Sequence, residues 1–203
     1  MKTIQMIFSY KGQRNYLQGA DIYNEIIKQV GRQYYGKMLN GIMLTFHSIA
    51  HNDCDLILAE SDEIIDKPLQ GIANFEVRFD KGKVTGWLIE TNRSVNTKTV
   101  FEEERIEAVC EIKGQTIILT GETGYTAIEE AVSMTKKLHN CIFPSKNKRW
   151  LFTKIDLTRI LKDNDASFLS ITNNHNFNNR LTKNEIFSHG EPIGYIYFSL
   201  VNL

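Results

Sequence analysis

Two stretches of the chain repeat one another, and this repetition constrains the fold more than any other feature of the sequence. Lys11-Gly12-Gln13 returns 102 residues later as Lys113-Gly114-Gln115. Four further identities follow without a gap, and they pair Leu17 with Leu119, Gly19 with Gly121, Tyr23 with Tyr125 and Ile26 with Ile128. Seven identities in sixteen aligned positions, against about one expected by chance, predict one structural unit used twice.

The length of the chain fits this arrangement. Each half of the 203 residues is only just long enough to enclose an adequate core, so packing the halves together would help both. We therefore expect a first repeat over residues 1–91, a linker over 92–104 and a second repeat over 105–203, packed as one globular unit. The linker range is polar and rich in Thr, Asn and Glu.

Composition excludes several classes of protein. The 24 Lys and Arg residues balance 24 Asp and Glu residues without a basic face, so we expect no nucleic-acid partner. Three cysteines, without a CxxC pair, are typical of reduced thiols in a cytoplasmic protein. The N-terminus lacks the pattern of a signal peptide, and no apolar stretch approaches the ~20 residues that span a bilayer. The sequence therefore predicts a cytoplasmic protein without a membrane span.

The first half reads as a strand, a helix and four more strands. Apolar residues alternate up to Tyr10, and from Asp21 an apolar face repeats at helical spacing until Gly36. Asp21 is a good N-cap and Gly36 a good stop signal. We expect the later strands at 41–50, 55–60, 71–79 and 83–91.

The second half repeats this order with differences. We expect strands at 106–112 and 116–119, a helix at 123–138, and strands at 149–157, 167–172 and 192–201. The last strand repeats the pattern of an earlier one, with Gly71-Ile72-Ala73-Asn74-Phe75 matching Gly194-Tyr195-Ile196-Tyr197-Phe198. The pattern gives only three strands after the helix, against four in the first half, and the asparagine-rich residues 173–179 read as a loop or a lid. One long helix with antiparallel strands in each repeat is an α+β arrangement.

This order of elements, present twice in about 100 residues each, resembles the hotdog fold in its fused, double form. The resemblance implies one long helix per repeat packed on a continuous antiparallel sheet. It also implies an acyl thioester as ligand, carried on coenzyme A or on an acyl carrier protein, with thioesterases and 3-hydroxyacyl dehydratases as the common enzymes. The thioester would lie between the two repeats, near the start of a long helix, where unpaired N–H groups stabilise an oxyanion. Exposed sheet edges make further self-association into a homo-oligomer plausible.

Asp21 is the first catalytic candidate that the resemblance implies. A carboxylate at the helix start could act as a general base on water, although an Asp there is also an ordinary N-cap. In the second half Thr123 takes this position, with Glu122 just before it. The residues expected to surround the substrate are Gly19, Tyr23, Gly121, Glu122 and Tyr125; for the two tyrosines, packing in the core is the favoured alternative.

His47 is the second catalytic candidate. A dehydratase needs an acid–base pair, and His47 with Asp21 or Glu122 could supply it. The usual dehydratase signature, a histidine followed shortly by proline and glycine, is missing. A strand histidine without a chemical role is the alternative.

The segment from His51 to Asp55 contains every common type of metal ligand. Alternate residues of a strand point to opposite faces, and no distant set of ligands completes a site, so we expect no metal and no other cofactor.

The sequence thus supports two hypotheses. The first is an acyl-thioester binding protein that hydrolyses or dehydrates its ligand. The second is a non-catalytic module built from the same repeat, which binds an acyl carrier protein, a lipid or another protein. The absence of the dehydratase signature and Thr123 opposite Asp21 favour the second hypothesis.

Overall fold

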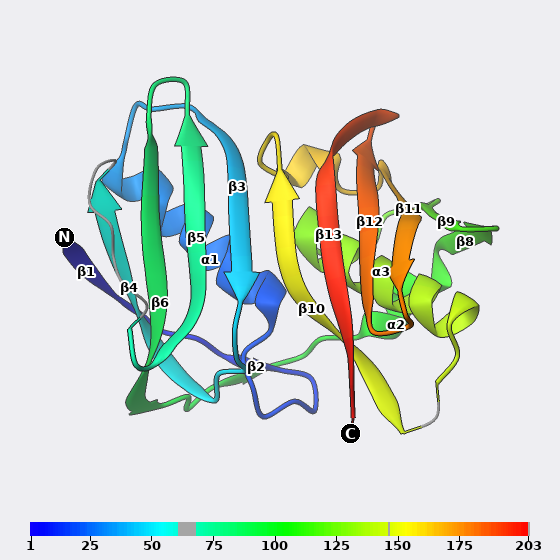
Figure 1. The fold of residues 1–203 in the computed structure, drawn as a ribbon, viewed down its shortest axis with the longest axis horizontal. Coiled ribbons are helices and arrows are strands. Elements are labelled where there is room, and N and C mark those ends of the chain that lie inside the picture. Colours follow the sequence, from blue (N-terminus) through cyan, green and yellow to red (C-terminus); the bar gives the residue numbers. More distant parts are fainter. Residues whose placement is uncertain (61–67, 146, 203) are drawn as a thin grey trace. The chain divides into compact units, whose positions relative to one another are not determined.

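The structure is a computed structural model that describes residues 1–60, 68–145 and 147–202. The chain divides into two compact units, Met1–Phe101 and Glu102–Leu203. Each unit contains an antiparallel sheet with one long helix on one face, so the fold is of the α+β class (Figure 1). Among the helices that the structure describes, none is long and apolar enough to span a bilayer.

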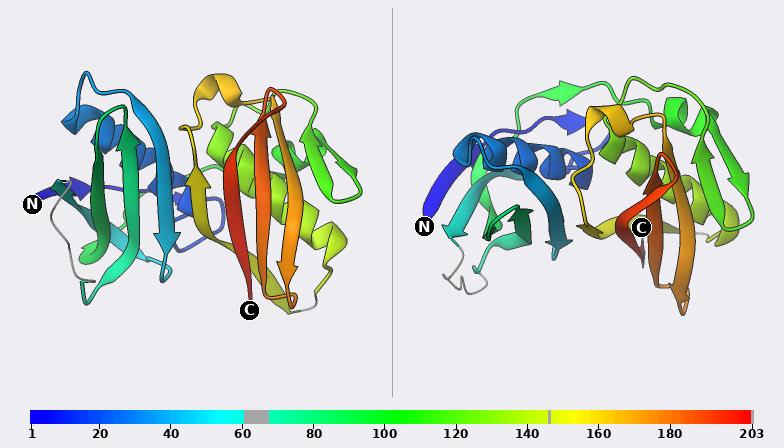
Figure 2. Two further views of the ribbon diagram at one scale, coloured as in Figure 1. Left: turned by 45° about the horizontal axis from the view of Figure 1, so that its top comes forward. Right: turned by 90° about the horizontal axis from the view of Figure 1, so that it is seen from above.

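In the described residues of the first unit, five antiparallel strands form the sheet. Their spatial order is β1 (Lys2–Met6), β4 (Asn52–Glu60), β6 (Lys83–Ser94), β5 (Gly71–Phe79) and β3 (Leu39–Phe46). A separate short parallel pair joins β2 (Tyr10–Lys11) to β7 (Lys98–Thr99). The sheet curves around the helix α1 (Gly19–Gln33), as Figure 2 shows.

Helix α1 buries an apolar face formed by Ala20, Ile22, Tyr23, Ile26 and Val30. It begins two residues before the predicted N-cap, because Gln18 is the N-cap residue. Asp21 is therefore the third residue of the helix, where its charge still interacts favourably with the helix dipole.

The core of the first unit depends on close packing between strands. Phe75 on β5 and Leu88 on β6 are fully buried on the face that α1 covers. Gly86 on β6 is the cross-strand partner of Phe75, and a Cβ atom there would come within 2.4 Å of the Phe75 ring and 2.3 Å of the Ile57 carbonyl oxygen. Only glycine fits at this position.

The sheet of the second unit has six antiparallel strands. Their order is β10 (Lys148–Leu157), β13 (Glu191–Asn202), β12 (Leu181–Ser188), β11 (Leu169–Phe177), β9 (Thr116–Leu119) and β8 (Cys110–Lys113). Helix α3 (Ala127–Ile142) covers one face, the short α2 (Glu103–Ala108) packs against α3, and a single 3₁₀ turn, η1, spans Asp163–Asp165.

Helix α3 begins four residues later than the sequence pattern predicts. Thr126 is its N-cap, and a capping box fixes the start, because the Glu129 carboxylate accepts hydrogen bonds from Thr126 N at 2.9 Å and from Thr126 Oγ1 at 2.7 Å. Thr123, the expected start, instead donates from its hydroxyl to Glu130 Oε1 at 2.6 Å.

One further prediction for the segments before α3 is wrong. Residues 106–112 do not form one strand, because α2 continues to Ala108 and β8 begins only at Cys110. The expected linker, residues 92–104, includes the end of β6, all of β7 and the first residues of α2.

The asparagine-rich residues 173–179 are part of a hairpin rather than a loop or lid. They complete β11 and enter the turn to β12. Asn178 and Asn179 both have φ of +54°, a backbone conformation that asparagine tolerates better than most residues. Four strands follow α3, and β12 is the one that the sequence pattern did not reveal.

The two units have the same order of elements along the chain but not the same order of strands in the sheet. In the first unit β5 lies beside β3, the strand that follows the helix, and β6 lies beside β4. In the second unit the last strand, β13, lies beside β10, and β12 lies beside β11. The matching sequences at 71–75 and 194–198 therefore occupy equivalent sheet positions, although they belong to different strands in the order of the chain.

The repeat that starts at Lys11 and Lys113 is local. Each lysine ends a short strand, and the following glycines, Gly12 and Gly114, have φ of +58° and +61°. The chain then takes different paths, because Gln115 is followed by β9 and the long helices begin at residues 19 and 127. The 102-residue register thus aligns two turns but not the two helices.

Candidate functional site

Two loops of the first unit meet before the start of α1. Leu17 N donates to Ala50 O at 2.8 Å, and the His51 ring nitrogen Nδ1 donates to Asn15 O at 2.9 Å. The Tyr10 hydroxyl also donates to the His51 carbonyl. These bonds fix the segment between β3 and β4 against the segment that leads into α1.

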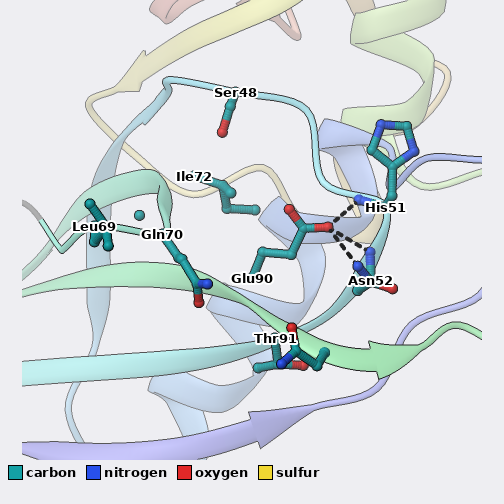
Figure 3. A pocket seen from close by; sticks show the side chains of 10 residues that line it. Ser48, His51, Asn52, Leu69, Gln70, Ile72, Glu90 and Thr91 are labelled. Atoms are coloured by element: carbon teal, nitrogen blue, oxygen red, sulfur yellow. Dashed lines mark hydrogen bonds between the residues drawn. The ribbon is translucent and has the colours of Figure 1, made fainter.

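A polar pocket of about 350 Å³ opens beside these loops (Figure 3). Its walls come from the segment between β3 and β4 and from the ends of β5 and β6. The lining is mostly polar and consists of Ser48, His51, Asn52, Leu69, Gln70, Gly71, Ile72, Glu90, Thr91 and Asn92.

The Glu90 carboxylate is the charged group of this pocket. Its Oε1 accepts three hydrogen bonds, from His51 N at 2.6 Å, Asn52 N at 2.9 Å and Asn52 Nδ2 at 3.2 Å. Figure 3 shows the second carboxylate oxygen turned away from these donors and towards the pocket. The protein therefore fixes one oxygen and presents the other.

Glu90 lies on the side of the sheet that α1 covers. It is the cross-strand partner of Cys54, whose side chain is fully buried. Burial and then the Glu90 charge raise the pKa of the Cys54 thiol to about 12, so this thiol stays protonated at neutral pH. The thiol is a core group and not a nucleophile.

Asp21 forms an ion pair in the same unit. Lys11 Nζ lies 2.5 Å from Asp21 Oδ1, and the two side chains are only 19% and 16% exposed. The Lys11 ammonium also lies 5.5 Å from the centre of the Phe101 ring. The carboxylate predicted to act as a base is thus held by a half-buried cation.

The other predicted residues of the first unit differ in their accessibility. Gly19 is the first residue of α1. Tyr23 is 1% exposed, so it fills the core between helix and sheet, which was the alternative for this residue.

His47 lies apart from Asp21. It follows the end of β3 and is exposed; its Nε2 is 2.7 Å from Asn74 Oδ1, and its ring stacks on Trp87 at 5.3 Å. Asn74 and Trp87 are cross-strand partners on the face opposite the buried Phe75, which means that they point away from α1. The sheet therefore separates His47 from Asp21, and the structure forms no acid–base pair from them.

The predicted residues of the second unit all precede α3. Glu122 is exposed, and Gly121 lies against Val109. The Tyr125 hydroxyl accepts a hydrogen bond from Glu102 N at 3.0 Å. Tyr125 is thus outside the helix, unlike Tyr23.

The second unit buries polar side chains that the sequence analysis missed. Glu130 is fully buried, accepts from Thr123 Oγ1 at 2.6 Å and from Ser167 N at 3.2 Å, and burial raises its pKa. His139 is also fully buried. Glu130 is at helical spacing from Met134 and Leu138, and His139 is at helical spacing from Ala131 and Thr135, so the available signal was their place on the buried face of α3.

Several solved structures have a fold similar to that of this chain. A pyran synthase domain from module nine of the sorangicin pathway has a TM-score of 0.54 and 9% identity, with 99% of this chain and 93% of that chain covered. A putative oleoyl thioesterase from Lactobacillus plantarum has a TM-score of 0.49 and 8% identity over 99% and 95% of the two chains. An acyl-ACP thioesterase from Bacteroides thetaiotaomicron has a TM-score of 0.48 and 10% identity over 98% and 97%.

These similarities concern the fold. The fold is similar to the hotdog fold, as the order of elements predicts. No protein-family model matches the sequence, and no curated protein matches it either.

Proposed function

We propose that the protein binds an acyl thioester carried on coenzyme A or on an acyl carrier protein. The observation that carries this proposal is the Glu90 carboxylate, one oxygen of which is fixed by three N–H donors while the other is presented to a pocket of about 350 Å³. The hotdog-like fold supports the choice of ligand, since the resemblance implies thioester chemistry.

The chemistry of the pocket suits the arm that joins the acyl group to either carrier. This arm contains amide N–H groups and a hydroxyl, which are donors that a carboxylate oxygen accepts. Gln70 and Asn92 add side-chain amides that can pair with the carbonyl groups of the arm. A volume near the lower end of the ~300–1,000 Å³ typical of ligand sites fits part of such a ligand.

A binding experiment tests this proposal. Titration calorimetry with a series of acyl-coenzyme A thioesters is expected to show saturable binding, and Glu90→Gln should weaken it about tenfold, since a hydrogen bond to a charged group contributes about 1.5–3 kcal/mol. Glu76→Gln is the matched control, because Glu76 pairs with Lys83 at 2.7 Å on the opposite face of the sheet. Equal affinity for all three proteins would show that the ligand does not occupy this pocket.

Hydrolysis of the bound thioester is the second candidate function. Asp21 would remove a proton from water as the water oxygen attacks the thioester carbonyl, the C–S bond would break, and the thiol would leave with a proton. The start of α1 offers N–H groups for the oxyanion. The ion pair with Lys11 opposes this role, because it stabilises the carboxylate in its resting state, and so it favours binding without turnover.

Chromatographic measurement of released coenzyme A separates the two functions without interference from the three cysteines of the protein. Hydrolysis by the wild type that falls at least tenfold in Asp21→Asn would establish Asp21 as the base. Binding without any release from the whole series would identify a non-catalytic binding protein.

A further inference from the structure

One face of the sheet in the second unit carries side chains that point away from α3. Ile196 and Phe198 on β13 are fully buried and point towards α3. Tyr195 and Tyr197 alternate with them along the strand, so they point the opposite way. Strands β10 and β12 alternate in the same manner. In Figure 1 this face of β10, β12 and β13 is turned to the viewer, and α3 lies behind the sheet.

The outward residues form two rows that run across the three strands. In the first row Lys154, Tyr197 and Lys183 are cross-strand partners. In the second row, Asp156, Tyr195 and Glu185 are cross-strand partners. In the backbone register each tyrosine thus has two lysines or two carboxylates as its cross-strand partners, and the rows lie about 7 Å apart, the distance between alternate residues of a strand.

Contacts within the face order these side chains. Lys183 Nζ lies 3.7 Å from the centre of the Tyr195 ring, and Lys154 Nζ lies 5.5 Å from the centre of the Tyr197 ring. Glu185 Oε2 accepts a hydrogen bond from Asn174 Nδ2 at 2.9 Å, and its charge raises the pKa of Tyr195. The tyrosine rings therefore hold the lysine ammonium groups through cation–π contacts.

We propose that this face binds the same face of a second copy of this chain. A two-fold axis that lies between the two sheets, parallel to the rows and midway between them, brings the basic row of each copy opposite the acidic row of the other. The same patch then serves both partners, as an isologous interface requires. A two-fold axis parallel to the strands would instead oppose like charges, so the charges also select the orientation.

The pattern of charge argues for this occupant over others. A nucleic acid or a strongly acidic protein would meet the Asp156 and Glu185 carboxylates, and a strongly basic protein would meet the lysines. A complementary partner must therefore carry one row of positive charges and one parallel row of negative charges, with an aromatic residue in each row. The chain itself has this surface, and the tyrosines supply the type of side chain that dominates protein interfaces.

Two charge-reversed variants test the proposal. Lys154→Glu with Lys183→Glu makes both rows acidic, and Asp156→Lys with Glu185→Lys makes both rows basic. Each variant should be monomeric in analytical ultracentrifugation under conditions where the wild type is dimeric, and an equimolar mixture of the two should dimerise again. Lys81→Glu with Lys162→Glu, which changes two exposed lysines elsewhere, is the control of equal charge and should remain dimeric.

The outcomes distinguish this interface from any other. Restoration in the mixture, together with dissociation of the wild type by salt, supports the proposal, because surface ion pairs are screened. A monomeric wild type overturns it, and so do variants that dimerise separately or a mixture that stays monomeric. Far-ultraviolet circular dichroism of each variant confirms that the sheet is folded, since the changed side chains lie outside the core.

Discussion

His139 shows how the core of the second unit holds a polar ring without a charge. Its Nε2 lies 2.9 Å from Asn184 Oδ1, and this oxygen must accept, because Asn184 Nδ2 already donates to Ile196 O at 3.0 Å. The ring packs against Trp150 and Phe198 with centres 4.6 and 5.4 Å away. Burial lowers the pKa of His139 to about 4, so the imidazole is neutral at physiological pH.

Acid should destabilise the protein through His139. The unfolded imidazole binds a proton near pH 6.5 and the folded one only near pH 4, so stability is lost as the pH falls between these values, by about 3 kcal/mol in total. Urea unfolding across this range should therefore show the wild type losing stability relative to His139→Gln. The comparison cancels Glu107 and Glu130, whose raised pKa values act in the opposite direction. His175→Gln, at an exposed site, should follow the wild type, and parallel curves for all three proteins would contradict the prediction.

Asp165 is a second buried charge, and it is fully paired. Burial alone would raise its pKa, but hydrogen bonds from Arg159 at 2.7 and 2.8 Å, from Ser188 Oγ at 2.5 Å and from Lys162 N at 2.8 Å lower the pKa to about 2. The lowered pKa stabilises the fold by about 2 kcal/mol above pH 3.8, and this contribution is lost as the pH falls towards 2.

Replacing the Asp165 carboxylate should therefore be costly. Asp165→Asn is expected to lower the free energy of unfolding by at least about 2 kcal/mol, because it removes a charge from the Arg159 pair and leaves donors without an ionised acceptor. Thermal unfolding at neutral pH measures this loss. Asp163→Asn, at an exposed site on the same turn, should leave the midpoint nearly unchanged, and equal effects of the two substitutions would refute the assignment.

For individual residues, the sequence indicated where a side chain lies along a helix or strand but not which other side chain it contacts. Asp21 was expected near the start of a helix and lies there, yet its pairing with Lys11 depends on how β2 is held beside β7. Glu90 carries no local signal, because its donors at residues 51 and 52 reach it only through the pairing of β4 with β6. A single sequence does not encode such pairs as a local pattern.

Among the elements, the strands with regular alternation were the most predictable. Strands β5 and β9 begin and end where the pattern of apolar residues predicts. Strand β12 was missed because two of its inward residues, Thr182 and Asn184, are polar, which hides the alternation even though both are fully buried. The start of α3 was misplaced because Thr123 and Thr126 are both good caps, and only Thr126 has a glutamate three residues later.

The capping box of α3 provides a test at the level of the element. Thr126→Ala removes the side-chain half of the box and should lower the free energy of unfolding by about 1 kcal/mol. Thr126→Ser keeps the hydroxyl and should retain most of the stability. Urea denaturation of both variants makes the comparison, and identical losses in the two would show that the hydroxyl of Thr126 does not cap the helix.

The whole molecule has a built-in reporter for each unit. Its two tryptophans are Trp87 in the first unit and Trp150 in the second. Trp87→Phe and Trp150→Phe therefore give proteins whose fluorescence follows one unit at a time. Among the described residues, His139 and Asp165 have lowered pKa values, and acid therefore destabilises the fold through them. Both residues belong to the second unit.

Acidification should therefore weaken the second unit more than the first. As the pH falls from neutrality to about 5, the urea midpoint reported by Trp150 should decrease, and the midpoint reported by Trp87 should decrease less. Fluorescence-monitored denaturation of the two single-tryptophan proteins provides the measurement. A larger shift at Trp87 would mean that the dominant acid-sensitive groups lie in the first unit.

The position of the last strand in each sheet has a consequence for synthesis of the protein. Strand β6 ends the first sheet in sequence yet lies between β4 and β5, and β13 likewise lies between β12 and β10. Until its last strand is available, the first half thus lacks the strand that joins two strand pairs, and the second half lacks the strand that joins β10 to the other four, so both have open strand edges. Such edges invite pairing with other nascent chains, so a pause in translation just before residue 83 or 191 should be a hazard for aggregation, and a chaperone that shields strand edges should act there.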